Sequence, residues 1–247
     1  MRNLVVQTKA IRTLLGASFE LEQRPSGMSG ICVVHGGSGF GKTTATAYIL
    51  NQQLVDGIYV RALSTWTPSS MLAALSGELG IKPLRPCARA VDAIVRRLCE
   101  AGRSVFIDEA DYLLHGEKML DTLRDIHDLS TVPLILIGMN RFRDSVAHRE
   151  QFAGRIYRDV RFTGLDETDA RLVADQLCDR AIIADDLVAA MLKETHGSIR
   201  RYRAKLTEIE AFAWKQGIPT IGLSDWQEAT RIARRGAAPA AKFAAAA

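Results

Sequence analysis

Residues 36–43 have the composition and spacing of a phosphate-binding loop. Their sequence, GGSGFGKT, matches the pattern G-x-x-x-x-G-K-[ST] at every fixed position. Glycines let successive backbone N–H groups turn toward one anion, and a helix that begins near Lys42 adds the positive end of its dipole. The Lys42 ammonium can reach the β- and γ-phosphates, and the Thr43 hydroxyl can bind Mg²⁺. The pattern predicts a nucleoside triphosphate site rather than a flexible linker, with contacts from Gly37, Ser38, Gly39, Phe40, Gly41, Lys42, Thr43 and Thr44.

Two adjacent acids follow a second apolar stretch. The sequence SVFIDEAD at 104–111 predicts a strand that delivers Asp108 to its carboxyl end, where open α/β sheets bind their ligands. Asp108 suits coordination of Mg²⁺, and Glu109 is placed to polarise an attacking water. The alternative is a strand that simply ends in solvated acids. Asp111 is interpreted only as an acid at the start of a helix.

A polar amide ends a third apolar stretch. The sequence VPLILIGMN at 132–140 predicts a buried strand that ends at Asn140. A neutral amide between the loop strand and the Asp108 strand could hold the γ-phosphate or the attacking water. The alternative for Asn140 is a turn residue or a helix N-cap.

These groups must be positioned by strands that end side by side. Apolar runs predict strands at 30–35, 57–63, 104–108, 132–138 and 159–163. Helical patterns occupy 43–54, 69–79, 88–101, 116–128 and 142–154, and such alternation is typical of a parallel sheet. After Gly164 the chain predicts helices only, at 167–179, 184–194, 198–216 and 224–235.

The change of composition at 164–166 predicts a domain boundary. The fold class is therefore α/β, with a parallel-sheet core followed by a small all-α unit. The predicted parts are an N-terminal helical lead-in at 1–28, the core at 29–164, the helical unit at 165–235 and a disordered Ala-rich tail at 236–247.

Composition and charge narrow the class of protein. The chain is 47% hydrophobic and 24% charged, which is ordinary for a globular protein with a buried core. Between 193 and 235 nine Lys and Arg face five acids, which favours a polyanionic partner such as nucleic acid, although solvated helix faces would explain the same charges. No apolar run has membrane-spanning length, the N-terminus lacks a signal-peptide pattern, and the four cysteines and five histidines lack metal-ligand spacing. These observations predict a cytoplasmic protein with reduced thiols.

The loop, the Asp108-Glu109 pair, Asn140 and the helical C-terminal part together resemble an AAA+ ATPase. The resemblance implies a five-stranded sheet of order 5-1-4-3-2, a C-terminal helical lid, and ATP with Mg²⁺ as ligands. It also implies an arginine that reaches a neighbouring subunit's γ-phosphate, for which Arg155 is the candidate and Arg158 the fallback. A second arginine at the start of a lid helix matches Arg200. The alternative for each is a surface arginine paired with a carboxylate.

A narrower resemblance links the chain to the phage Mu B-type transposition ATPases. It rests on residues 59–62 (YVRA), 65–67 (TWT), 107–113 (IDEADYL), 136–138 (LIG) and 197–201 (GSIRR). The resemblance implies an ATP hydrolase of a bacterial host cytoplasm that polymerises on duplex DNA, delivers target DNA to a transposase and hydrolyses ATP to disassemble. The Mu type has an N-terminal helix-turn-helix appendage, whereas this chain reaches its loop strand by residue 30, so DNA contact is expected from the core.

The AAA+ resemblance places DNA beyond the second strand and its following helix. The candidate contacts there are Arg61, Thr65, Trp66, Lys82, Arg85 and Arg89. Lys and Arg would neutralise phosphates and give sequence-tolerant, salt-sensitive binding. The alternative is that Trp66 packs in the core and the cations only solubilise the surface.

Two other functions remain open from sequence. One is a different AAA+ role with the same site, namely a helicase loader, replication initiator or secretion-associated ATPase. The other is a regulatory module that uses the nucleotide only as a conformational switch, against which the Asp108-Glu109 pair argues.

Overall fold

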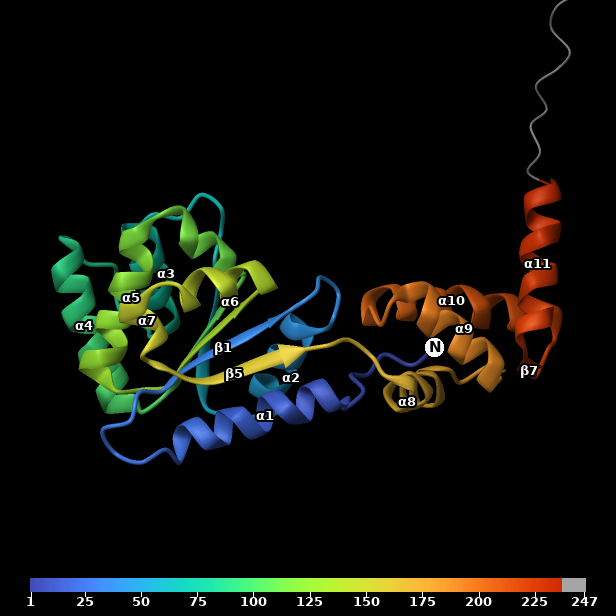
Figure 1. The fold of residues 1–247 in the computed structure, drawn as a ribbon, viewed down its shortest axis with the longest axis horizontal. Helices are drawn as coiled ribbons and strands as arrows, with labels where there is room; N and C mark the ends of the chain where they lie inside the picture. Colours follow the sequence, from blue (N-terminus) through green and yellow to red (C-terminus); the bar gives the residue numbers. More distant parts are fainter. Residues whose placement is uncertain (237–247) are drawn as a thin grey trace, which may run out of the picture. The chain divides into compact units, whose positions relative to one another are not determined.

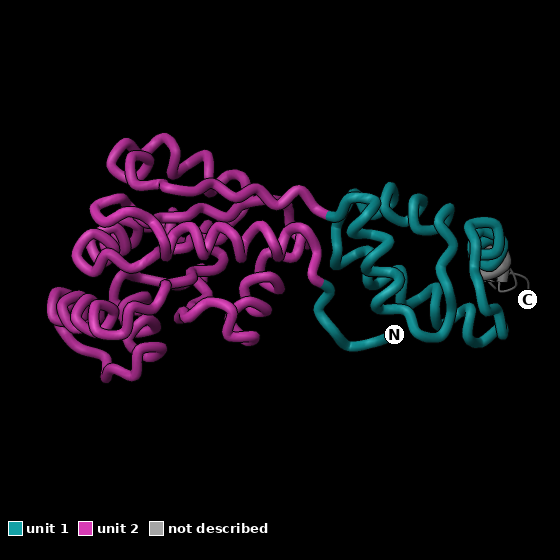
Figure 2. Tube along the Cα trace, turned by 90° about the horizontal axis from the view of Figure 1, so that it is seen from below, with its two compact units in different colours: residues 1–6, 165–247 teal, residues 7–164 magenta. Residues whose placement is uncertain are grey.

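The computed structural model describes residues 1–236 and divides into two compact units. One contains residues 7–164; the other combines residues 1–6 with the chain from Leu165 onward (Figure 2). Residues 1–28 were predicted to form one N-terminal helical lead-in. In the structure, residues 1–6 belong to the C-terminal unit instead. The predicted disordered tail lies, from residue 237 on, outside the described residues.

A parallel five-stranded sheet forms the centre of unit 7–164. Its strands are β1 (Ile31–Gly36), β2 (Gly57–Arg61), β3 (Ser104–Asp108), β4 (Leu134–Gly138) and β5 (Ile156–Phe162). Their order is β2-β3-β4-β1-β5, which confirms the predicted sheet order. Because all pairings are parallel, the carboxyl ends of β1, β3 and β4 meet at one edge of the sheet.

Helices cover both faces of this sheet (Figure 1). They are α1 (Lys9–Glu22), α2 (Lys42–Asn51), α3 (Pro68–Glu78), α4 (Cys87–Ala101), the 3₁₀ helix η1 (Ala110–His115), α5 (Glu117–Ser130), α6 (Asn140–Ala147) and α7 (Glu150–Ala153). The helix predicted at 142–154 is thus two helices. A continuous helix would turn Arg149 and Glu150 toward the buried face of Phe142 and Val146, so the chain breaks and buries Phe152 instead.

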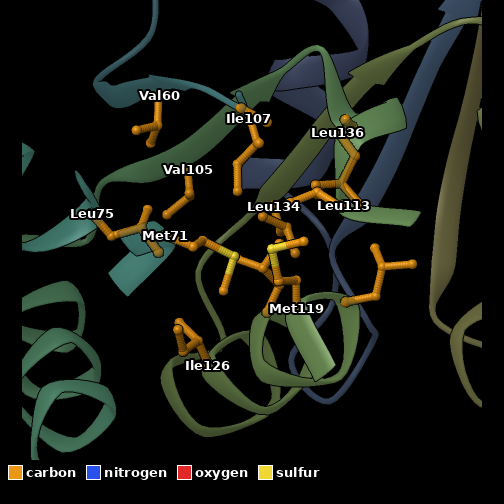
Figure 3. Packing of buried hydrophobic residues seen from close by; sticks show 14 of the residues in the cluster. Val60, Met71, Leu75, Val105, Ile107, Leu113, Met119, Ile126, Leu134 and Leu136 are labelled. Atoms are coloured by element: carbon orange, nitrogen blue, oxygen red, sulfur yellow. The ribbon is translucent and has the colours of Figure 1, made fainter. Parts of the chain in front are cut away.

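Successive residues of the strands face opposite layers. Ile31 and Val33 of β1 join a cluster with α3, α4, η1, α5 and α6, whereas Cys32 and Val34 join a cluster with α1 and α2. Figure 3 shows the first cluster, in which Val105 and Leu134 lie among side chains such as Met71, Met119 and Ile126. The residue after Val34, His35, continues the alternation and faces the layer that contains α6.

The other unit contains helices and a minimal sheet. Its elements are α8 (Glu167–Leu177), β6 (Ile182–Ile183), α9 (Asp185–Thr195), α10 (Ile199–Gln216), β7 (Thr220–Ile221) and α11 (Leu223–Gly236). The prediction of helices alone after Gly164 was wrong, because β6 and β7 pair in parallel and bury Ile183 and Ile221. Two-residue strands are too short to show a period in the sequence. Among the helices of residues 1–236, none combines the length and hydropathy needed to cross a bilayer.

Candidate nucleotide-binding site

The glycine-rich loop connects the buried strand β1 to helix α2. Gly39 and Gly41 have φ values of +79° and +90°, a left-handed conformation that favours glycine. A Cβ at Gly36 would lie 2.4 Å from the carbonyl oxygen of Phe162, so this position also requires glycine. Lys42 Nζ donates to the carbonyl oxygens of Gly36 at 2.7 Å and Gly37 at 3.0 Å. The Lys42 ammonium therefore lies over the phosphate-binding loop predicted from the sequence.

Asp108 is the centre of a buried hydrogen-bond cluster at the end of β3. Its side chain accepts from Thr43 Oγ1 at 2.6 Å, from the Tyr59 hydroxyl at 2.9 Å and from the backbone N–H of Glu109 at 2.8 Å. Burial and the Asp108 carboxylate raise the pKa of Tyr59, so the phenol stays protonated and donates. The structure thus brings together Thr43 and Asp108, and it adds Tyr59, for which no role was predicted from the sequence.

Glu109 has a strained backbone and a basic neighbour. Its φ of +55° is unusual for a residue other than glycine and is a conformation concentrated at functional sites. The carboxylate is partly exposed, and its Oε1 lies 3.4 Å from Arg61 Nη2. Arg61 ends β2 beside β3, so a predicted DNA contact and the predicted catalytic base are adjacent.

Asn140 is held at the carboxyl end of β4. It is the first residue of α6, whose N-cap is Met139, so the N-cap alternative does not describe its side chain. Its Oδ1 lies 2.9 Å from His35 Nδ1, and Met139 Sδ lies 3.7 Å from Lys42 Nζ. The end of β4 is therefore next to the phosphate loop.

Asp111 has a larger role than an acid at a helix start. Its buried carboxylate accepts from the backbone N–H of Met139 at 2.8 Å and from Arg141 Nε at 2.8 Å. These bonds fix the turn from β4 into α6. The sequence could not reveal them, because the partners are about 30 residues away along the chain.

The donor set fits a nucleoside triphosphate with Mg²⁺. A glycine cradle with a lysine suits phosphates, and a hydroxyl beside a carboxylate is the oxygen pair that Mg²⁺ prefers. Thr43 and Asp108 would hold the ion, which supplies neutralisation of phosphate charge. Ser38, Phe40 and Thr44 lie on the same loop and helix start and stay predictions as nucleotide contacts.

Arg155 lies away from this edge, directly before β5. Its guanidinium pairs with Asp128 through Nε–Oδ1 at 2.9 Å and Nη2–Oδ2 at 2.8 Å, and it is about a third exposed. It lines a pocket of about 630 Å³ with Arg24 and His127 among the other walls. Arg158 instead pairs with Glu20 at 2.6 Å.

Buried His127 positions the backbone beside Arg155. Its Nδ1 is 2.8 Å from the carbonyl oxygen of Val132, and its Nε2 accepts from the N–H of Gly30 at 3.1 Å. Burial lowers the pKa of His127, which keeps Nε2 unprotonated and able to accept. Ser29 Oγ bonds the carbonyl oxygen of Arg155 at 2.7 Å.

The remaining candidates are Arg200 and the expected DNA contacts. Arg200 is exposed near the start of α10, where Ser198 caps the helix, and its role stays a prediction. Arg61 and Thr65 precede α3, whereas Lys82, Arg85 and Arg89 follow it, and a helix of 11 residues is about 16 Å long. In the part of the chain that the structure describes, no ion pair engages these last three cations. Trp66 is half-buried against the core cluster, so only part of its ring is available to a ligand.

Comparisons with known proteins agree with this fold. A family model described as an AAA domain matches residues 27–146, and no curated protein matches the chain. Among solved structures, the Aeropyrum pernix ORC1 protein in complex with DNA aligns with a TM-score of 0.63 at 19% identity, covering 95% of this chain and 67% of that one. The fold is that of the AAA+ ATPases. The narrower resemblance to the phage Mu B type stays a prediction.

Two further AAA+ structures have the same likeness. The ADP form of the Aeropyrum pernix ORC2 protein gives a TM-score of 0.67 at 16% identity, covering 94% of this chain and 70% of that one. The Thermotoga maritima RuvB Holliday junction branch migration motor gives 0.61 at 16%, covering 92% and 70%. The chain thus spans about two thirds of the length of these structures.

Proposed function

We propose that the protein is an AAA+ ATPase that assembles head-to-tail on duplex DNA, selects target DNA for a transposase and hydrolyses ATP to disassemble. The observation that carries this proposal is the contact of Arg61 with Glu109. It places a cation on the expected DNA surface against the residue expected to activate water. The transposase role is supported by the sequence resemblance alone.

Each residue of the site has a separate role in the proposed hydrolysis. Lys42 and the loop N–H groups bind the phosphates, while Thr43 and Asp108 hold Mg²⁺. Tyr59 donates to Asp108 and orients its carboxylate. Glu109 accepts the proton of the attacking water, and Asn140 holds that water or a γ-phosphate oxygen.

Arg61 couples DNA binding to ATP hydrolysis. While Arg61 Nη2 lies 3.4 Å from Glu109 Oε1, the guanidinium occupies the carboxylate that is expected to activate water. A DNA phosphate competes for the same guanidinium, since Arg pairs with phosphate as well as with carboxylate. Binding of duplex DNA would therefore release Glu109 and increase hydrolysis.

Arg61→Ala is expected to raise ATP turnover without DNA and to reduce the stimulation by duplex DNA to less than about twofold. Turnover is measured with and without duplex DNA across a salt series, since phosphate contacts weaken with salt. Arg97→Ala is the matched control, because Arg97 is an exposed arginine paired with Glu100 on α4. DNA stimulation of Arg61→Ala equal to that of the parent would contradict the proposed coupling, and absence of turnover in the parent under both conditions would contradict the enzyme.

Arg155 is proposed to complete the site of a neighbouring subunit. It must exchange Asp128 for a phosphate, and both partners are partly exposed, so the exchange is open to solvent. The pocket beside it leaves space for the neighbour's surface.

Mixing two inactive variants tests this arrangement. Arg155→Ala and Lys42→Ala are each expected to be inactive alone, and equimolar mixing is expected to restore turnover, because a Lys42→Ala subunit still offers Arg155 to an intact phosphate loop. Arg158→Ala mixed in the same way is the control. If the Arg155→Ala mixture stays inactive, Arg155 acts within its own subunit or not at all.

A replication initiator or helicase loader is the second candidate function. The likeness to an initiator protein solved with DNA favours it. Electron microscopy with duplex DNA and a non-hydrolysable ATP analogue shows whether the protein assembles on DNA. The genes that flank the coding sequence distinguish a transposase partner from a helicase partner. A neighbouring integrase-type transposase gene is expected for the first proposal, and a replicative helicase gene would favour the second.

A further inference from the structure

His35 links the end of the loop strand to Asn140 and β5. The side chain is 10% exposed, and both ring nitrogens have partners. Nδ1 lies 2.9 Å from Asn140 Oδ1, and Nε2 lies 2.9 Å from Asp159 Oδ1. Arg143 Nε in turn donates to Asp159 Oδ2 at 2.8 Å. Four side chains from β1, α6 and β5 thus form one continuous chain of hydrogen bonds.

We propose that His35 is a positioning residue whose protonation state selects which end of the Asn140 amide faces the nucleotide. This inference rests on the proposed ATP hydrolysis and adds regulation of its rate by the protonation of His35. A side-chain amide has a donor end and an acceptor end of nearly equal size, so either end fits the 2.9 Å contact. Whether Nδ1 carries a proton decides which end of the Asn140 amide faces the ring.

With a neutral ring, Asp159 fixes the tautomer. Its carboxylate accepts the proton of Nε2, which leaves a lone pair on Nδ1. The Asn140 amide then donates its N–H to Nδ1 and presents its carbonyl oxygen to the nucleotide side. A carbonyl accepts from the attacking water, so this state orients the nucleophile.

With a protonated ring, both nitrogens donate. Nδ1–H then bonds the Asn140 carbonyl, and the NH₂ end faces the nucleotide side. An amide N–H donates to a γ-phosphate oxygen but does not accept from water. This state binds the phosphate without orienting the nucleophile, so kcat falls while affinity is kept.

Charged groups from each neighbouring element surround the ring. From β5 come Asp159 and Arg161, the latter opposite His35 in register, and from α6 comes Arg143, which also approaches Asp144 at 3.6 Å. Lys42 of the loop donates to Gly36, the residue after His35, and Asp111 of η1 is paired with Arg141. Since β4 offers only Gly138 opposite the ring, Asp159 is the carboxylate that contacts His35.

Steady-state ATP hydrolysis measured across a series of pH values tests the proposal, because histidine is the side chain that changes charge near neutral pH. The parent kcat is expected to rise with pH at constant KM. In His35→Asn the new amide occupies the place of Nδ1 and cannot titrate, so kcat stays within a few-fold of the parent and its pH profile becomes flat. In His35→Gln the place of Nδ1 is lost, and kcat falls about tenfold or more. The control is His148→Gln, an exposed histidine at the end of α6.

A measurement without turnover separates this inference from the proposed function. Imidazole ¹⁵N spectra of the parent are expected to show the neutral His35 ring with its proton on Nε2, and Asp159→Asn is expected to weaken that preference. A proton on Nδ1 of the neutral ring would overturn the inference even if the enzyme hydrolyses ATP. A parent-like pH profile in His35→Asn would overturn it as well. If the parent hydrolyses no ATP, the proposed function fails, and the tautomer still decides the hydrogen-bond direction.

Discussion

Replacing Glu109 by glutamine is expected to reduce ATP turnover by about two to four orders of magnitude while ATP still binds. The amide has the shape of the carboxylate but cannot accept a proton from water. The left-handed backbone at this position and the hydrogen bond from its N–H to Asp108 do not depend on the side chain, so the phosphate and Mg²⁺ contacts stay in place. Turnover and the ATP dissociation constant are measured on the same preparation.

The matched control is Glu100→Gln, which removes one exposed carboxylate on α4. Its turnover is expected to equal that of the parent. On the proposed function, Glu109→Gln assemblies should also persist on duplex DNA, because hydrolysis is the step that releases them. Turnover at the parent rate would show that another group activates the water.

Lys42→Ala is expected to weaken ATP binding by about 100-fold or more, which corresponds to about 2.7 kcal/mol. The ammonium is the charged donor of the loop, and hydrogen bonds between charged partners are roughly twice as strong as neutral ones. Loss of Nζ also removes its bonds to the carbonyl oxygens of Gly36 and Gly37. Calorimetric titration with ATP and Mg²⁺ measures the effect, and nucleotide-dependent DNA binding is expected to disappear with it.

Lys193→Ala provides the comparison for this variant, since Lys193 is an exposed lysine of α9. Its ATP affinity should match that of the parent. Thermal unfolding of both variants checks that the fold is kept. ATP affinity unchanged in Lys42→Ala would mean that the loop does not bind the β- and γ-phosphates.

The sequence predicted the parts of the site that lie within single segments. The loop at 36–43 is contiguous, and Asp108 and Asn140 each end an apolar run, so strand ends alone placed them at one edge of the sheet. The sheet order came from the family resemblance and not from periodicity. The structure confirms that order.

The contacts that orient these groups could not be predicted. Tyr59 contacts Asp108 because β2 and β3 pair in one particular register. The sequence does not specify that register, so it does not predict which hydroxyl contacts which carboxylate. His35 reaches Asp159 across two adjacent strands in the same way. The only signal was a polar residue at the end of an otherwise apolar strand.

The C-terminal unit includes residues 1–6, which are far from the rest of it along the chain. Val6 is buried among residues such as Ala170, Leu177 and Leu206, so its packing partners lie at least about 160 residues further on. At a synthesis rate of about 5 to 20 residues per second, the ribosome needs roughly 8 to 32 s to cover that distance. During this time residues 7–164 can complete their sheet while the first six residues wait for their partners. Residues 7–164 are therefore expected to complete their sheet during translation before the C-terminal unit packs around residues 1–6.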